Sequence, residues 1–266
     1  VWENEIHALN QQAPVVLRTN TLKTTNDQLK AELSAEGIET DILPDYNDAL
    51  QLKERTNVFK TDAFKKGHFE VQDASSQLVA EFLEVQPGMR VVDTCAGAGG
   101  KTLHLSALMD NKGQLIATDI YENKLKELKR RAKRAGAHNI DPRTISSTKV
   151  VKKLYGTADR VLIDAPCSGL GVLSRNPDAK WKLQPEFLET IKLTQEQILA
   201  QYSRIVKPGG KMVYATCSVL PSENQEQVQK FLASEDGKNF KLSKDRKILS
   251  SESGYDGFYM ALLERE

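Results

Sequence analysis

Short apolar runs alternate with longer amphipathic stretches from about residue 68 to the end of the chain. The runs predict strands over 90–94, 113–120, 160–166 and 209–218. The stretches between them predict helices near 75–84, 101–109, 122–135, 185–206 and 222–234. In the last of these helices, Ser222 and Gln225 have the spacing of a capping box. Strands that alternate with helices of this length predict an α/β fold with right-handed crossovers and a mainly parallel, Rossmann-like sheet.

The first part of the chain follows a different pattern. Its apolar positions predict two strands and one helix, over 15–21, 38–43 and 25–37. Within the helix, Leu29 and Leu33 lie one turn apart, and Gly37 ends it. We therefore expect a small α+β domain over residues 1–67 and a larger α/β domain over residues 68–266.

Composition places the chain among globular proteins. Its 266 residues are 39% hydrophobic, which is enough for a large buried core without disulfides or structural metals. No apolar run approaches the roughly eighteen residues that cross a bilayer, and the first residues lack the layout of a signal peptide. We therefore expect a cytoplasmic protein without a membrane partner. The three cysteines form no CxxC pair and no zinc-like spacing with histidine, so we expect no metal and three thiols available for chemistry.

The formal charge of +1 hides an uneven distribution. Residues 1–70 carry 8 Lys and Arg against 12 Asp and Glu, whereas residues 101–160 carry 14 against 6. A polyanion would therefore prefer the second segment. Seven of its basic side chains lie on the predicted helix 122–135, where they either form a solvated face or contact such a polyanion.

The sequence RVVDTCAGAGGKT, residues 90–102, places a glycine-rich loop after the first strand of the larger domain. In a doubly wound sheet, ligands bind beyond the carboxyl ends of the strands, where glycines allow backbone N–H groups to approach them. A P-loop needs a glycine at position 95, where Cys95 stands, and a dinucleotide loop needs one at position 102, where Thr102 stands. The loop therefore either binds another ligand or serves only as a tight turn.

S-adenosylmethionine fits more of the loop's surroundings. The second strand ends in Asp119, whose carboxylate can accept hydrogen bonds from both ribose hydroxyls of an adenosine-type cofactor. The sequence IDAPC, residues 163–167, lies at the end of the fourth strand, where sheets of this type place the reacting group. As an alternative, Asp119 is an ordinary cap at the end of a strand.

Five segments of the larger domain, taken together, resemble one known protein family. They are DTCAGAGGKT, TDI, LIDAPCSGLGVLSRNPDAKW, YATCSVLPSEN and DGFYMALL. Together they resemble the Sun-type two-cysteine RNA (cytosine-5) methyltransferases, in particular the ribosomal RNA branch. The resemblance covers the chain from about Phe69 onwards, and PVVLRTNTLKTT is similar to the start of the family's small N-terminal RNA-binding region. It implies a Rossmann-like methyltransferase with S-adenosyl-L-methionine as cofactor and ribosomal RNA of the small subunit as partner.

The resemblance also implies which residues bind the cofactor. They are Cys95, Ala96, Gly97, Ala98, Gly99, Gly100, Lys101, Asp119, Ser147 and Asp164. Ser147 marks a departure, because family members usually carry an acid at the end of the third strand, near the adenine. Ser146 and Ser147 lie in that neighbourhood here, and Asp141 lies too early to replace the acid. Since a serine offers no charge, we expect the cofactor to bind somewhat more weakly.

Asp164 and Lys101 are candidate catalytic groups beside the cysteines. Cytosine C5 is a poor nucleophile, so a thiolate must first add at C6 and produce an enamine whose C5 can attack the sulfonium methyl group. Asp164 could share a proton with N3 of the base and hold its exocyclic amine, or it could cap the turn before Pro166. Lys101 could anchor the substrate, anchor Asp164 or face solvent.

Two cysteines, Cys167 and Cys217, follow the ends of predicted strands near the methyl donor. Position alone leaves open which thiol attacks, and in DNA cytosine methyltransferases the cysteine after proline is the nucleophile. Resemblance to the two-cysteine RNA family assigns the attack on C6 to Cys217 and the release of the methylated product to Cys167. Cys95 is assigned no catalytic role.

The segment after Cys167 contains candidate RNA contacts. A target base must be unstacked to reach a catalytic pocket of this kind. Arg175, Asn176 and Trp181 could clasp the flanking nucleotides by charge and stacking. Two other functional classes stay open, a P-loop-like nucleotide-binding NTPase and a catalytically inactive RNA-binding protein, and the sequence leaves the oligomeric state open.

Overall fold

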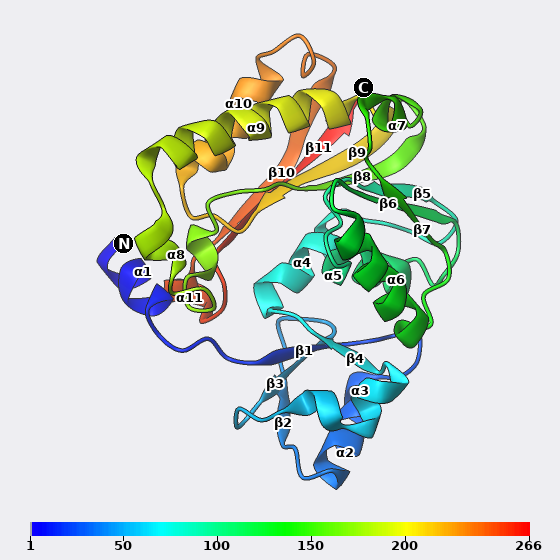
Figure 1. The fold of residues 1–266 in the computed structure, drawn as a ribbon, viewed down its shortest axis with the longest axis vertical. Coiled ribbons are helices and arrows are strands. Elements are labelled where there is room, and N and C mark those ends of the chain that lie inside the picture. The colour runs from blue at the N-terminus through cyan, green and yellow to red at the C-terminus, as the bar shows by residue number, and fades with distance from the viewer. Residues whose placement is uncertain (1) are drawn as a thin grey trace.

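The computed structural model describes residues 2–266 and contains two β-sheets (Figure 1). The strands of the larger sheet are β5 (Arg90–Asp93), β6 (Gln114–Asp119), β7 (Ile140–Thr144), β8 (Ala158–Asp164), β9 (Val206–Thr216), β10 (Phe240–Ile248) and β11 (Phe258–Arg265). Their order is β10–β11–β9–β8–β5–β6–β7, and β11 is the one strand that runs opposite to all the others. The chain reverses its direction of travel across the sheet between β5 and β8, which creates a topological switch point. This mainly parallel sheet confirms the Rossmann-like prediction.

Helices cover both faces of this sheet. α4 (Ala74–Phe82), α5 (Gly100–Leu108) and α6 (Glu122–Ala135) lie on one face, and α7 (Thr148–Lys152), α9 (Pro185–Ser203) and α10 (Gln225–Leu232) lie on the other. Two short helices, η2 (Leu170–Val172) and α8 (Ala179–Lys182), follow β8. Val91 belongs to the core beneath α4 and α5, and the adjacent Val92 belongs to the core beneath α9. Because both faces are covered, the strands read as near-continuous apolar runs.

The smaller sheet is built from the first quarter of the chain and is antiparallel throughout. Its strands are β1 (Val16–Thr19), β2 (Thr40–Ile42), β3 (Ala49–Leu52) and β4 (Phe69–Val71), in the order β2–β3–β1–β4. It is accompanied by α2 (Asn26–Ala35), η1 (Val58–Lys60) and α3 (Asp62–Lys66). Leu29 and Leu33 of α2 are both buried in its core, as their helical spacing predicts. β4 lies beyond residue 67, so the hydrogen-bonded sheet extends past the point at which the sequence pattern changes.

The two sheets are joined through α4, α5 and α6, which lie between them (Figure 1). Arg18 of β1 donates a hydrogen bond to the carbonyl oxygen of Gly100, at the start of α5, over 2.6 Å. Glu70 of β4 pairs with Arg131 and Arg134 of α6 at 3.0 and 2.5 Å. The small sheet is therefore attached directly to the two helices that flank the glycine-rich loop.

The first helix, α1 (Trp2–Leu9), packs against an element from the other end of the sequence. It contacts α11 (Ser250–Ser253), close to the C-terminal strand. The buried carboxylate of Glu5 accepts hydrogen bonds from the backbone N–H groups of Ser250 and Ser251, both at 2.9 Å. Glu5 therefore satisfies the first turn of α11 and ties the beginning of the chain to its end.

The start of α10 differs from the prediction. Pro221 opens a short 3-10 helix, η3 (Pro221–Glu223), and α10 begins only at Gln225. The predicted capping box of Ser222 and Gln225 is therefore wrong, since Asn224 precedes the helix and makes no side-chain cap. The Asn224 side chain instead hydrogen-bonds the chain around the end of β9. Long-range contacts thus determine where this helix begins.

Candidate active site

The glycine-rich loop joins the end of β5 to the start of α5 at the switch point of the sheet. Gly97 and Gly99 adopt positive φ values of 55° and 89°. A Cβ atom at Gly99 would lie 2.6 Å from Cγ of Leu128 in α6, so glycine is required there on both counts. Gly97 and Gly100 border open space instead. The loop therefore packs tightly on α6 while its other side leaves room at the first turn of α5.

Asp119, the last residue of β6, shapes this loop. Its carboxylate accepts hydrogen bonds from the backbone N–H groups of Gly97 and Tyr121, both at 2.8 Å. It thus acts as a local cap, but each carboxylate oxygen retains a second lone pair that can accept a ribose hydroxyl. The first N–H groups of α5 have no partner within the helix and suit a carboxylate. These donors and acceptors fit the amino acid tail and the ribose of S-adenosylmethionine.

Asp93 is buried beneath the loop, and the partly buried Cys95 begins the loop. Asp93, at the end of β5, accepts a hydrogen bond from the hydroxyl of Thr102 over 2.7 Å. Burial raises the pKa of Asp93 to about 7. Burial also raises the pKa of the Cys95 thiol and holds it in the neutral form. Cys95 can therefore lend its backbone to the loop, but it does not offer a thiolate.

Asp164 and Lys101 form an ion pair between the end of β8 and the start of α5. Lys101 Nζ lies 2.7 Å from Asp164 Oδ2, and it lies 5.2 Å from the centre of the Phe258 ring. Burial opposes the charged ammonium, but Asp164, together with smaller effects of Cys217 and Asp93, outweighs burial and raises the pKa of Lys101. Of the three alternatives for Lys101, the structure supports contact with Asp164 and excludes a solvent-facing side chain.

The two predicted catalytic thiols meet at the ends of the adjacent strands β8 and β9. The Sγ atoms of Cys167 and Cys217 are 3.3 Å apart. The hydrogen bond between them lowers the pKa of Cys217 against the opposing effects of burial and of Asp164, and Lys101 adds a smaller lowering effect. The same hydrogen bond, together with burial, raises the pKa of Cys167 well above its ordinary value. The pair therefore favours a thiolate at Cys217 and a proton on Cys167.

Backbone contacts hold the chain after Cys167 against Cys217. The N–H group of Gly171, in η2, donates to the carbonyl oxygen of Cys217 over 2.8 Å. The N–H group of Gly257 donates to the carbonyl oxygen of Gly171 over 2.7 Å. A Cβ atom at Gly171 would lie only 2.1 Å from the carbonyl oxygen of Gly257, so the close approach requires glycine. Three segments of the chain thus meet around the thiols.

Glu223 is a residue of this region that sequence patterns did not reveal. Its side chain is fully buried and accepts hydrogen bonds from Ser168 and Ser218, the residues that directly follow the two cysteines. Its signal in the sequence is weak: an acid in PSEN, within a segment that periodicity assigns to a helix. The repeated Cys-Ser dipeptide is the pattern that could have pointed to it.

The predicted RNA contacts have different environments. The Arg175 guanidinium pairs with Asp256 at 2.7 Å and with Asp73 at 2.8 Å, so it is already engaged within the protein. Asn176 is exposed, and Trp181 of α8 is 79% exposed. Asn176 and Trp181 are therefore free to meet a partner, whereas Arg175 primarily fixes its own segment. RNA contact by all three stays a prediction.

The basic helix α6 divides in a similar way. Arg131 and Arg134 both face Glu70, and Arg131 also donates to the carbonyl oxygen of Ala98 in the glycine-rich loop over 2.8 Å. Lys129 and Arg130 are exposed. Part of this helix therefore supports the cofactor loop and the small sheet, and another part forms an open basic surface.

The predicted adenine contact stays a prediction. Ser147 is exposed and precedes α7 without a side-chain cap. Asp141, near the start of β7, pairs with Arg143 at 2.6 Å. The chain from Thr144 to Thr148 contains no acid, so the third strand ends without a carboxylate.

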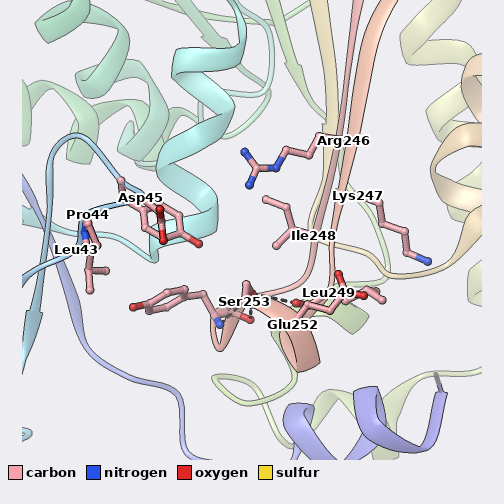
Figure 2. A pocket seen from close by; sticks show the side chains of 11 residues that line it. Leu43, Pro44, Asp45, Arg246, Lys247, Ile248, Leu249, Glu252 and Ser253 are labelled. Atoms are coloured by element: carbon pink, nitrogen blue, oxygen red, sulfur yellow. Dashed lines mark hydrogen bonds between the residues drawn. The ribbon is translucent and has the colours of Figure 1, made fainter.

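A hollow of about 680 Å³ lies at another place, between the loop after β2 and the end of β10 (Figure 2). Its lining includes Asp45 and Glu252 as well as Arg246 and Lys247, so its charges balance. Figure 2 shows Arg246 reaching over the hollow and Lys247 pointing away from it. None of the residues predicted to bind the cofactor or to act in catalysis lines this hollow. It is therefore separate from the thiol pair and the glycine-rich loop.

All three cysteines are free thiols. Residues 2–266 contain no group of three or more His, Cys, Asp and Glu side chains placed to hold a metal ion.

Over the same part of the chain, no helix has the length and apolar character needed to cross a membrane.

Two family models match the chain. The model of the 16S rRNA methyltransferase RsmB/F family matches residues 80–264. A model described as the ferredoxin-like domain of RsmF/B-like methyltransferases matches residues 1–59. The matched regions contain the large sheet with its glycine-rich loop and thiol pair, and most of the small sheet.

Individual proteins give the same picture. Ribosomal RNA small subunit methyltransferase B of Vibrio vulnificus is 33% identical over 272 residues, covering 100% of this chain and 63% of its own length. The crystal structure of PH0851 superposes with a TM-score of 0.93 at 31% identity, covering 99% of this chain and 62% of that one. A methyltransferase homolog protein from Pyrococcus horikoshii has a TM-score of 0.87 at 26% identity, covering 99% and 90%. The chain spans less than two thirds of the length of the curated relatives that it matches.

Proposed function

The chain belongs to the 16S rRNA methyltransferase RsmB/F family, and on this basis we propose that it transfers a methyl group from S-adenosylmethionine to C5 of a cytosine in small-subunit ribosomal RNA. S-adenosylmethionine is the cofactor of this family. Ribosomal RNA as substrate is supported by the names of the matched relatives. Membership in a methyltransferase family argues against the NTPase alternative, as does Cys95 at the position where a P-loop needs glycine.

The observation that carries the proposal is the thiol pair. Cys167 and Cys217 lie 3.3 Å apart at the ends of β8 and β9, beside the ion pair of Asp164 and Lys101. A methyl group can be transferred to an oxygen or an amine without a covalent enzyme intermediate, whereas C5 of cytosine requires a nucleophile at C6. Two thiols at one site suit a reaction in which one thiol attacks and must later leave.

The proposed site for the cofactor is the loop from Cys95 to Gly100 together with Asp119. When bound there, S-adenosylmethionine supplies the electrophilic methyl group. The N–H groups at the start of α5 bind its amino acid tail, and Asp119 accepts hydrogen bonds from its ribose. Asp164 lies at the end of β8, next to the position that the reacting group would occupy.

The proposed mechanism assigns one task to each side chain around the base. The Cys217 thiolate adds to C6, and Asp164 shares a proton with N3 and accepts a hydrogen bond from the exocyclic amine. Lys101 keeps Asp164 in place through the ion pair of 2.7 Å. After C5 has gained the methyl group, a water molecule takes the C5 proton, the electron pair of that C–H bond forms the C5–C6 double bond, and the C6–S bond breaks so that Cys217 leaves as a thiolate. Cys167 assists this last step because its Sγ lies within proton-transfer distance of Cys217 Sγ.

The test is methyl transfer to RNA with a mapped product. The protein is incubated with small-subunit ribosomal RNA and S-adenosylmethionine carrying a labelled methyl group, and the labelled nucleotide is identified by mass spectrometry. We expect label in 5-methylcytosine and in no other nucleotide. Label in an N-methylated or ribose-methylated nucleotide would contradict the proposal, and RNA binding without any transfer would support the inactive RNA-binding alternative.

A further inference from the structure

Glu223 lies directly behind the two thiols, in the short helix η3. Its Oε2 accepts a hydrogen bond from the Ser168 hydroxyl over 2.5 Å and another from the Ser218 hydroxyl. Its Oε1 accepts from the Ser168 N–H group over 2.8 Å and from Gln195 Nε2 over 3.0 Å. One carboxylate therefore binds both of the loops that carry the cysteines.

The geometry of the serines repeats the geometry of the thiols. Ser168 follows Cys167 and Ser218 follows Cys217, and the two hydroxyl oxygens are 3.2 Å apart. The two Sγ atoms in front of them are 3.3 Å apart. We call the hydrogen bonds from the two serine hydroxyls to Glu223 the clamp. Because each serine directly follows its cysteine in the chain, the clamp also sets the separation of the thiols.

The clamp is anchored from several directions. Gln195 of α9 donates to Glu223 and also to the carbonyl oxygen of Pro166, both at 3.0 Å. The Tyr214 hydroxyl donates to the backbone carbonyl oxygen of Glu223 over 2.7 Å. In the described part of the chain, no basic side chain pairs with Glu223. All of its partners are neutral donors, so its negative charge is held by hydrogen bonds and is not cancelled by a cation.

We propose that Glu223 is a positioning residue for the methyl transfer proposed above: it fixes the separation of the Cys167 and Cys217 thiols, and its charge keeps the proton on Cys167. The inference rests on the proposed function for its role in catalysis, but its effect on the thiols can be measured without RNA. It explains why a carboxylate is buried where a neutral side chain could serve as a hydrogen-bond acceptor.

The charges around the pair agree with this division. Lys101 and Asp164 face Cys217 from α5 and β8, where Asp164 raises the pKa of the Cys217 thiol and Lys101 lowers it by a smaller amount. Glu223 faces Cys167 from η3 and raises the pKa of that thiol, after the larger effects of Cys217 and of burial. The Tyr214 hydroxyl lies on the same side, and burial raises its pKa, so it stays neutral. Cys217 therefore faces a paired cation and anion, whereas Cys167 faces the unpaired anion of Glu223.

The experiment uses Glu223→Gln and follows the two thiols separately. Glutamine has the same shape, and its amide can donate to the serine hydroxyls, which rotate to accept, so packing is retained while the charge is lost. Rates of alkylation of each cysteine by iodoacetamide are measured across pH by mass spectrometry of the peptides. We expect the apparent pKa of Cys167 to fall by about one unit, so that the preference for Cys217 drops about tenfold. We also expect kcat for methyl transfer to fall with KM for RNA unchanged.

Glu5→Gln is the matched control. Glu5 is also a buried carboxylate that accepts two hydrogen bonds, but it lies at α11 and should leave both alkylation profiles unchanged. Ser168→Ala with Ser218→Ala removes the clamp but keeps the charge. This double variant should lower kcat without lowering the pKa of Cys167, and it serves as the second test if Glu223→Gln melts at a much lower temperature.

The outcomes separate the two proposals. Wild-type protein that alkylates as expected but transfers no methyl group would overturn the proposed function and leave the thiol assignment of Glu223 standing. Alkylation profiles and kcat of Glu223→Gln equal to those of the wild type would overturn the inference about Glu223. An equal change in Glu5→Gln would overturn it as well, because the effect would then be general to buried carboxylates.

Discussion

Replacement of each catalytic thiol by alanine should give opposite results. Cys217→Ala removes the nucleophile, so we expect no methylation and no covalent complex with RNA. Cys167→Ala leaves the attack intact but removes the group that assists release, so we expect RNA to stay attached to the protein. The two variants are compared by denaturing gel electrophoresis after incubation with RNA and S-adenosylmethionine.

The reverse pattern would reassign the thiols. If Cys217→Ala accumulated the denaturant-stable complex and Cys167→Ala formed none, the cysteine after proline would be the nucleophile, as in DNA cytosine methyltransferases. Cys95→Ala serves as the control, because burial keeps the Cys95 thiol neutral and it lies outside the pair. It should form and resolve the complex as the wild type does.

Asp93 should make the stability of the protein depend on pH. Burial raises its pKa to about 7 in the folded state, whereas in an unfolded chain the value is about 3.9. Between these values the folded state binds more protons, so this group lowers the free energy of unfolding as the pH rises from about 4 to about 7. Chemical denaturation of wild type and Asp93→Asn across this range measures the effect.

The comparison with Asp93→Asn isolates this residue from other titrating groups, such as Asp256, whose pKa burial raises to about 6. We expect the wild type to lose stability relative to the variant by at most roughly 1.4 kcal/mol for each pH unit within the window, and by nothing further above it. A difference in unfolding free energy that is constant from about pH 4 to about pH 8 would show that burial does not raise the pKa of Asp93.

At the scale of elements, the sequence predicted no ranges for β7, β10 and β11 of the large sheet, but it predicted β5, β6, β8 and β9 and the longer helices. This was possible because both faces of the sheet are covered, so residues such as Val91 and Val92 are buried alike and leave an unmistakable apolar run. It failed at α10, where Pro221 and the side chain of Asn224 shift the first helical residue. Those contacts connect η3 to β9, and a local pattern does not contain them.

The junction of the glycine-rich loop with α6 gives a prediction at this scale. Gly99→Ala places a Cβ atom 2.6 Å from Leu128 Cγ, in addition to the strain of a positive φ. We expect it to lower the free energy of unfolding by about 1–3 kcal/mol more than Gly97→Ala, which shares the positive φ but borders open space. We also expect weaker binding of S-adenosylmethionine in calorimetry, because the loop must move away from α6.

Gly97→Ala is the informative partner in this pair. Its Cβ would point into the space that we assign to the cofactor. It should therefore weaken cofactor binding with a small effect on stability, in contrast to Gly99→Ala. Equal stabilities of the two variants would show that Leu128 of α6 shifts at little cost to accommodate the added Cβ atom. The loop would then not be held by close packing.

At the scale of the whole molecule, contacts between distant segments decide which charged residues are available. Glu70 of the small sheet binds Arg131 and Arg134 of α6, and Asp73 and Asp256 bind Arg175. In the sequence these arginines are indistinguishable from their exposed neighbours. The presence of Lys101, Asp164, Cys167 and Cys217 near one another could be predicted, since each lies near the carboxyl end of a strand. The ion pairs and the clamp of Glu223 could not, because they depend on how separate loops and sheets are packed.

The difference between buried, paired arginines and exposed basic side chains decides which residues of α6 test RNA binding. Lys129 and Arg130 are exposed on α6, where Arg130 pairs with Glu127 of the same helix at 2.8 Å. Arg134 is paired with Glu70 of the small sheet, so its replacement would disturb the junction of the two sheets as well as any RNA contact. Lys129→Ala with Arg130→Ala therefore tests the basic surface alone. If both side chains bind phosphates, the slope of log K against log salt should fall by about 0.7–0.9 for each phosphate that the variant leaves without a cation, because fewer counterions are released.

The control pair is Lys238→Ala with Lys241→Ala, which removes the same charge from the opposite edge of the large sheet, where β10 begins. RNA affinity is measured by fluorescence anisotropy at several salt concentrations for wild type and both double variants. We expect the α6 variant to bind more weakly and with a smaller salt slope, and the control to match the wild type. Equal slopes in all three proteins would mean that the exposed part of α6 is a solvated face, and that the RNA is held by other surfaces such as that around Trp181.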